Sequence, residues 1–335
     1  MSNKTLIIIF GALAVILILL LMRDRRIERP DDVFLLVDTT KISEISIKQG
    51  TTTTLLKKEG GEWRMKQPVD WPVQAWAMTN MLNSIDTLEV EYIVTEDPTK
   101  YKDFEVDDEK GALITINTGK EKVEFVVGSL GATWRHTHMR KPGDKNVYLV
   151  KGSIRSYLVK RPDDWRDRRI FNIPDDSLLA VTAKFDKGGW TLAKDDTTWM
   201  VDIGNKKIMP DDNVRTGVIS GLVRLNIGDF PPDSVVRIAS FAEPLVTFNF
   251  TLKDNSSHSV VFAKHPSNDQ QVLFKVDNRP DIFGQWKGSF DMLNKKGEEW
   301  KTPPAPKAPK GAPGKAGTPP KKGAKKDDHK GHDHG

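Results

Sequence analysis

Residues 45–63 read ISIKQGTTTTLLKKEGGEW, and residues 181–199 read VTAKFDKGGWTLAKDDTTW. In both stretches, apolar residues alternate with polar ones on either side of glycine-containing turns, a pattern typical of short antiparallel strands. Each stretch ends in a tryptophan, and Trp63 and Trp199 lie 136 residues apart (199 − 63 = 136). The sequence therefore predicts two copies of one small β-meander.

A helical pattern follows each meander. In the first copy, Asp70 and Pro72 are typical of a helix start, and apolar residues then recur at three- and four-residue spacing from Met78 to Leu88. In the second copy, Pro210 to Asp212 precede an apolar face of Val214, Val218, Leu222 and Leu225. Each copy therefore contains one main helix, which we expect to pack on the strands.

Further alternation predicts the remaining strands of both copies. In the first copy these are residues 112–116, 123–127, 133–139 and 147–150, followed by a short helix over 153–158. In the second copy they are residues 246–252, 260–262 and 272–276, followed by a short helix ending at Trp286. The second copy is shorter after its central hairpin, which predicts that a strand or loop is missing there.

The predicted fold class is α+β, with two tandem repeats of an antiparallel sheet with one main helix each, preceded by one transmembrane helix. Strands arrive in runs rather than alternating with helices, which disfavours a parallel doubly wound sheet. The expected division is: 1–4 short N-terminal segment, 5–22 transmembrane anchor, 23–40 juxtamembrane linker, 41–160 first repeat, 161–174 charged connector, 175–293 second repeat, and 294–335 disordered Lys/Pro/Gly/His-rich tail.

The anchor is the uninterrupted apolar run from Thr5 to Met22. Eighteen helical residues rise about 27 Å, close to the roughly 30 Å hydrocarbon core of a bilayer. A cleaved signal is the alternative, but the run is longer than the usual apolar core of a signal and ends in leucines and arginines. Arg23, Arg25 and Arg26 by themselves favour a cytoplasmic body.

Charge and composition exclude several classes of function. The net charge of +5 comes from the C-terminal segment, because residues 301–335 hold nine lysines and three aspartates (+6) and the rest of the chain sums to −1. The expected folded part is therefore nearly neutral, and no nucleic-acid partner is expected. Cysteine is absent, which excludes disulfides, a cysteine nucleophile and iron–sulfur clusters. No cofactor is expected.

Several motifs resemble one family. They are the opening LVDTTKI at residues 36–42, the segment from Gly61 to Pro68, the helix after Pro72, the pair Val127-Gly128, and the connector WRDRR at residues 165–169. Over residues 35–290 the chain resembles the bacterial domain-of-unknown-function 4340 family. That resemblance implies a duplicated α+β region behind a membrane helix, with the body outside the cytoplasm. It also implies an accessory role beside ABC-type transport systems like those of gliding motility, and it brings no catalytic residues.

Candidate site residues fall into two groups. Histidines are weak candidates for metal ligands: His136 and His138, which share one face of a predicted strand, and the tail residues His329, His332 and His334. For the first pair a structural or exposed role is favoured, and for the tail a solvated segment. Tryptophan and arginine are enriched at interaction hot spots. The interface candidates are Trp134, Arg135, Arg140, Trp165, Arg166, Arg168 and Arg169.

The sequence favours a non-enzymatic accessory or scaffold protein of an ABC-type transport or cell-envelope complex. We expect it to be single-pass in the bacterial inner membrane, with a periplasmic body and an ABC-type permease or other envelope membrane protein as partner. Two alternatives stay open. One is a periplasmic ligand-binding subunit that uses the cleft between the repeats, and the other is an envelope hydrolase or metal-dependent enzyme centred on His136 and His138.

Overall fold

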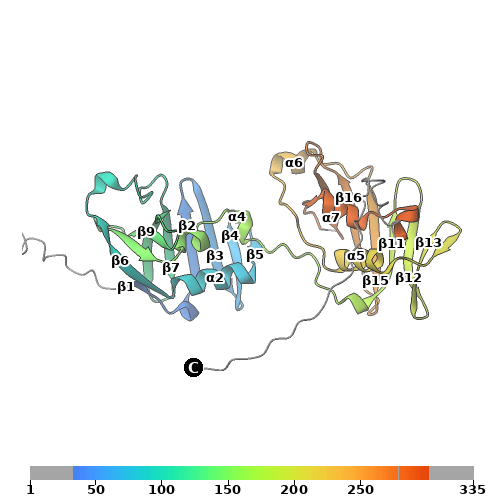
Figure 1. The fold of residues 1–335 in the computed structure, drawn as a ribbon, viewed down its shortest axis with the longest axis horizontal. Coiled ribbons are helices and arrows are strands. Elements are labelled where there is room, and N and C mark those ends of the chain that lie inside the picture. Colours follow the sequence, from blue (N-terminus) through green and yellow to red (C-terminus); the bar gives the residue numbers. More distant parts are fainter. Residues whose placement is uncertain (1–32, 278, 302–335) are drawn as a thin grey trace, which may run out of the picture. The chain divides into compact units, whose positions relative to one another are not determined.

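The computed structural model describes residues 33–277 and 279–301, which form two compact units (Figure 1). The first unit runs to Asn172 and also includes Arg224–Pro232. The second unit comprises Ile173–Val223 and the chain from Asp233 onward. A short piece of the second half of the sequence therefore belongs to the first unit. Element labels below are those of Figure 1.

The first unit is built on a ten-stranded antiparallel sheet with the strand order β1-β6-β10-β9-β8-β7-β2-β3-β4-β5. The strands are β1 (Val33–Leu36), β2 (Glu44–Gln49), β3 (Thr52–Glu59), β4 (Glu62–Gln67), β5 (Trp71–Pro72), β6 (Thr87–Thr95), β7 (Ala112–Asn117), β8 (Lys122–Leu130), β9 (His136–Arg140) and β10 (Val147–Lys151). Its short 3-10 helices are η1 (Thr39–Lys41) and η2 (Pro98–Lys100).

Helices cover one face of this sheet. They are α2 (Ala75–Ile85), α3 (Ile154–Leu158) and α4 (Pro162–Trp165). The apolar spacing of α2 buries Ala77, Met78, Met81 and Ile85 in one cluster with the inward side chains of the strands. The helical periodicity in the sequence thus reports the face of α2 that contacts the sheet.

A loop covers the opposite face. Residues 96–111 connect β6 to β7, and Val106 from this loop packs against Val126 and Val147 in a second, smaller cluster. The loop reaches the sheet at Gly128, where an added Cβ would lie 2.3 Å from the carbonyl oxygen of Phe104. Only glycine at this position of β8 allows so close an approach of two backbones.

The second unit is built on an eight-stranded antiparallel sheet with the strand order β14-β13-β12-β11-β15-β16-β17-β18. The strands are β11 (Leu178–Lys184), β12 (Gly189–Asp195), β13 (Thr198–Ile203), β14 (Lys206–Ile208), β15 (Val246–Leu252), β16 (Ser257–Lys264), β17 (Gln271–Val276) and β18 (Phe283–Trp286). Its helices are η3 (Asp175–Ser177), α5 (Asp212–Val223), α6 (Asp233–Ile238), α7 (Lys287–Leu293) and η4 (Gly297–Trp300).

The two sheets share one topology. The order from β10 to β5 in the first unit matches the order from β18 to β14 in the second, strand for strand. The pairing registers agree as well, since Leu56 faces Met65 in the first unit and Leu192 faces Val201 in the second, each 136 residues later. This confirms the predicted repeat of an antiparallel α+β unit.

Several details differ from the expectations. The second unit has no counterpart of β1 or β6 among its described residues, so the missing strand follows the main helix rather than the central hairpin. Residues 283–286 form strand β18 rather than the end of a helix, which begins at Lys287. The segment FGQW is apolar and short, and pairing with β17 decides its conformation.

The expected boundaries also shift. Strand β1 lies in the segment expected to be a linker, and the described structure continues past residue 293 to Trp300, whose side chain is fully buried. The burial of this indole in the second core explains why the expected tail starts later. No described helix is long and apolar enough to cross a membrane. The expected anchor, residues 5–22, lies outside the described residues.

Candidate functional site

Strand β9 presents alternate residues on the face of the first sheet opposite the helices. His136, His138 and Arg140 are partly exposed, whereas Thr137 and Met139 between them are buried. This alternation follows from the two-residue period of a strand. The two histidines and Arg140 therefore share one face of the sheet.

His138 holds the loop over residues 96–111 in place. Its Nδ1 lies 3.1 Å from the carbonyl oxygen of Ser129, and its ring centroid lies 4.8 Å from that of Phe104 in the loop. The Ser129 hydroxyl donates to the Phe104 carbonyl, so Nδ1 carries the proton that it shares with the Ser129 carbonyl. Burial lowers the pKa of His138, against a smaller raising effect of that hydrogen bond.

His136 contacts different groups. Its Nδ1 lies 3.2 Å from the Thr133 hydroxyl, and its Nε2 lies 4.0 Å from a carboxylate oxygen of Glu91 on β6. Within residues 33–277 and 279–301, no three histidine, aspartate or glutamate side chains come together in a way that could hold a metal ion. His329, His332 and His334 lie outside the described residues.

Trp134 lies in the loop between β8 and β9, and its side chain is 72% exposed. Its backbone adopts φ +62°, a conformation that bulky residues rarely take. Three hydrogen bonds fix the loop: Trp134 N donates to Gly131 O at 2.9 Å, Gly152 N donates to Arg135 O at 2.7 Å, and the Ser153 hydroxyl donates to Trp134 O. The fold thus presents Trp134, beside exposed Arg135, in a defined position.

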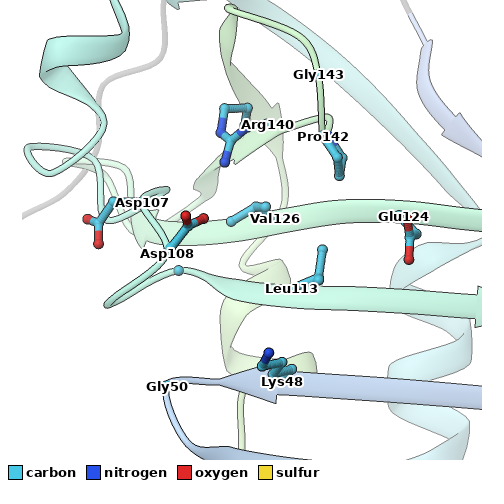
Figure 2. A pocket seen from close by; sticks show the side chains of 11 residues that line it. Lys48, Gly50, Asp107, Asp108, Leu113, Glu124, Val126, Arg140, Pro142 and Gly143 are labelled. Atoms are coloured by element: carbon cyan, nitrogen blue, oxygen red, sulfur yellow. The ribbon is translucent and has the colours of Figure 1, made fainter.

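Arg140 lines a cavity of about 460 Å³ on the same face of the sheet (Figure 2). The floor is a row of directly paired residues on β2, β7, β8 and β9, namely Lys48, Leu113, Val126 and Arg140. Three strand spacings separate the ends of this row, about 14 Å at the backbone. A lysine and an arginine therefore flank an apolar floor.

Carboxylates line the same cavity. Asp107 Oδ1 accepts hydrogen bonds from the amides of Glu109 and Lys110 at 2.8 and 3.1 Å. Burial alone would raise the pKa of Asp107, but these amides outweigh burial and lower it. In Figure 2 the Asp107 carboxylate points away from the floor, whereas Asp108 lies closer to Val126. The cavity thus carries charges of both signs.

Glu124 and Arg140 are already engaged inside the unit. Lys122, 2.8 Å away, and the Thr115 hydroxyl lower the pKa of Glu124. Arg140 donates to the Val106 carbonyl through Nε and Nη2 and stacks 4.6 Å from the Tyr101 ring. Because these contacts fasten the 96–111 loop, Arg140 supports the shape of the cavity as well as lining it.

Comparison with protein families gives one match. Residues 63–238, more than half of the chain, match the family described as "Domain of unknown function (DUF4340)". The chain belongs to this family. The match is shorter than the 35–290 resemblance expected from the motifs, and it runs from β4 to the end of α6. Neither the curated proteins nor the solved structures yield a match to this DUF4340 protein.

The matched region includes the connector, whose tryptophan does not lie at the surface. Trp165 is 0% exposed and belongs to the core of the first unit, and its carbonyl accepts a hydrogen bond from Gln74 N at 2.8 Å. The hypothesis that Trp165 is an exposed docking residue is therefore wrong. Charged neighbours in the sequence suggested exposure, but the turn formed by α4 directs the indole inward.

The arginines of the connector contact the segment 224–232. The guanidinium of Arg166 lies 4.6 Å from the Trp71 ring and 3.4 Å from the Phe230 ring. Arg168 Nη1 donates to the carbonyl of Gly228 at 2.7 Å. Arg169 pairs with Asp167 at 2.6 Å and keeps a mostly exposed side chain. Arg166 and Arg168 therefore act within the first unit, and Arg169 remains at its surface.

Sequence reasoning missed the segment 224–232. Its backbone pairs with the connector, since Ile170 N donates to Leu225 O at 2.9 Å and Ile227 N donates to Arg168 O at 2.7 Å. The available signal was an apolar segment after α5 in place of the strand that follows α2. Nothing local indicates that such a segment packs against residues about 60 positions earlier.

Proposed function

We propose that this DUF4340 protein is a membrane-anchored, non-enzymatic accessory or scaffold protein of a transport or cell-envelope complex, and that it docks a membrane partner through the Trp134 loop. The loop is residues 131–135. The apolar run over residues 5–22 supports the anchor. The exposure of Trp134 on a hydrogen-bonded loop supports docking.

The presentation of Trp134 is the observation that carries the proposal. A left-handed backbone at a bulky residue costs about 1–2 kcal/mol, and an exposed indole returns none of it through burial. Tryptophan and arginine side chains are the usual anchors of protein interfaces, and a loop already held in place loses little entropy on binding. Trp134 and Arg135 combine both properties.

A site-specific crosslink tests the docking. The photo-crosslinking amino acid p-benzoylphenylalanine replaces Trp134 in the full chain, which is expressed in its native membranes and irradiated. We expect an adduct with an integral membrane protein. The same replacement of Trp286, which is 51% exposed in the second unit, serves as the control. Equal adducts from both positions, or none from position 134, would remove the support for this surface.

The proposed location is periplasmic, with the N-terminus inside. The family resemblance supports this orientation against the arginines after the apolar run. Because the chain has no cysteine, a Lys120→Cys variant carries a single thiol in the exposed turn between β7 and β8. A membrane-impermeant maleimide should label it once the outer membrane is permeabilised. Labelling only after the inner membrane is broken would place the body in the cytoplasm.

A further inference from the structure

The second unit contains a cavity of its own, of about 760 Å³. It lies where the β11–β12 turn, the β13–β14 turn, the start of β15 and the segment after α7 meet. Its apolar lining consists of Phe185, Trp190, Ile203, Pro244 and Leu245. A cavity of this size and character is typical of small-molecule sites, which usually measure about 300–1,000 Å³.

The first unit serves as an internal control for this lining, because strand pairing identifies the equivalent residues. Ile47 faces Thr54 in the first unit, and Ala183 faces Trp190 in the second, so these strands correspond at an offset of 136 residues (190 − 54 = 136). Leu113 and Thr247 face the equivalent lysines Lys48 and Lys184, which sets the offset at the next strand to 134 (247 − 113 = 134).

Polar residues occupy the equivalent positions of the first unit. By these offsets, Gln49, Thr54, Gln67 and Lys110 correspond to Phe185, Trp190, Ile203 and Pro244. In the first unit, Gln49 Nε2 donates to the Lys110 carbonyl at 3.1 Å, which joins the turn to the loop. In the second unit, Phe185 and Pro244 can make no such hydrogen bond and instead line the cavity. Two repeats of one scaffold thus differ here in a consistent direction.

The rim of the cavity adds charge. Lys187 and Lys296 line it together with Asp186, and Lys296 Nζ lies 5.0 Å from the centroid of the Phe185 ring. Neither lysine side chain is ion-paired in the part of the chain that the structure describes. Two ammonium groups beside an aromatic wall favour a ligand with an apolar body and a negative charge at one end.

We propose that this second-unit cavity binds a small organic anion with an aromatic or acyl body and a single carboxylate. The body occupies the apolar wall of Phe185, Ile203 and Leu245, and the carboxylate lies between Lys187 and Lys296. Asp186 opposes the carboxylate by like-charge repulsion. This ligand site is separate from the Trp134 loop, so the failure of either proposal leaves the other standing.

Calorimetric titration of the full chain in lipid nanodiscs tests the site, with the heat of empty nanodiscs subtracted. The probes are 2-naphthoate for an aromatic body, octanoate for an acyl body, and neutral 2-naphthylmethanol. We expect one of the two carboxylates to bind and the alcohol to bind at least tenfold more weakly. Equal binding of the alcohol, or no binding of either carboxylate, would overturn the proposal.

Variants locate the site. Phe185→Gln introduces the residue of the first unit and should abolish binding, while a Lys187→Gln/Lys296→Gln double variant should weaken it about tenfold. Asp186→Asn should tighten binding about threefold. Lys264→Gln, an exposed lysine elsewhere in the second unit, is the matched control and should change nothing. All five positions are at least partly exposed, so the variants should keep the wild-type circular dichroism. Unchanged binding in Phe185→Gln would overturn the proposal.

Discussion

The two units are one scaffold used in two ways. Eight strands correspond in order, but only the first unit extends its sheet at both ends. At one end β6 and β1 follow β10, and at the other the connector pairs with β5 through the bridge from Val73 to Arg166. In the second unit the chain after α5 does not form a strand on its own sheet. It supplies Arg224–Pro232 to the first unit instead. Duplication thus conserved the central sheet and left its edges free to diverge.

The cores show the same contrast. Three inward positions filled by aliphatic side chains in the first unit hold phenylalanine in the second, and all six residues are 0% exposed. The pairs are Ile114 and Phe248, Val127 and Phe262, and Met139 and Phe274. Beside Phe248, Ala183 stands where Ile47 stands beside Ile114, so the larger ring is offset by a smaller neighbour. Matched volume, not identity, preserves the fold.

The largest expected effect tests whether the two tryptophans are equivalent. Gln74 N donates to Trp165 O and Asp211 N donates to Trp300 O, each at 2.8 Å, and both indoles are fully buried. Trp165→Ala and Trp300→Ala should each cost about 4 kcal/mol of unfolding free energy, because a buried ring is lost and a cavity remains. Hydrogen exchange measured by mass spectrometry should place each loss in the unit that holds the substitution.

Trp134→Ala is the control for these variants, because its side chain is mostly exposed and its removal should change stability by less than about 0.5 kcal/mol. A loss of protection spread equally over both units in either core variant would show that the two cores do not unfold separately.

The next effect tests the segment that crosses from one half of the sequence to the other unit. Phe230 is 8% exposed, and its ring packs edge-on against Trp71 with the two centroids 5.7 Å apart. Phe230→Ala should cost about 3 kcal/mol and should lower hydrogen-exchange protection in β5 and the connector. Ile238→Ala, an exposed apolar residue at the end of α6, should have little effect. Loss of protection confined to β11–β18 would contradict the assignment of Phe230 to the first unit.

Local patterns predicted much of this fold. Alternation of apolar residues around Gly50 and Gly60 indicates the meander, and the spacing of Met78, Met81 and Ile85 indicates the buried face of α2. The constant distance between Trp63 and Trp199 revealed the duplication. These features depend on neighbours within a few residues, which is why the sequence alone displays them.

Features that depend on distant residues were not predictable in this way. The residues of β6 carry apolar and acidic side chains in alternation, yet only β10 and β1 on either side make them a central strand. Trp165 was read as exposed because its neighbours are charged, whereas those arginines hold the 224–232 segment. The second-unit cavity emerged only when strand registers aligned the two repeats. Tertiary partners decide each of these cases.

A smaller effect tests why the outer faces of the sheets differ. Strand pairing makes Ala263 the equivalent of Gly128, and in the first unit the loop over residues 96–111 covers this position. Gly128→Ala should cost about 2 kcal/mol, because the new Cβ meets the Phe104 carbonyl and the loop must shift. Urea unfolding gives the free energy. Ala263→Gly is the reverse change, and it should cost at most about 1 kcal/mol through chain entropy. Equal costs would show that the loop does not require the glycine.

The smallest effect concerns acid. His138 corresponds to the fully buried Leu273 of the second unit, but it is about half-exposed to solvent and contacts Phe104 and Ser129. Its pKa is lowered in the folded protein by burial, so the unfolded chain binds the proton more readily. The neutral ring therefore contributes its full stability above the unfolded pKa of about 6.5, and that stability is lost as pH falls through the lower folded pKa.

Solvent screening limits this contribution to about 0.5 kcal/mol. His138→Leu introduces the residue of the second unit and should remove that part of the pH dependence, while it replaces the contact with Phe104 by an aliphatic one. Urea unfolding of both proteins at pH 7.5 and 5.5 measures the difference, and the other histidines cancel because the variant retains them. Wild type should lose more stability than His138→Leu over this interval, with hydrogen exchange rising first in the 96–111 loop. An identical loss in the two proteins would mean that His138 fixes the loop by shape alone, and that the charge state of its ring has no part in how the two outer faces diverged.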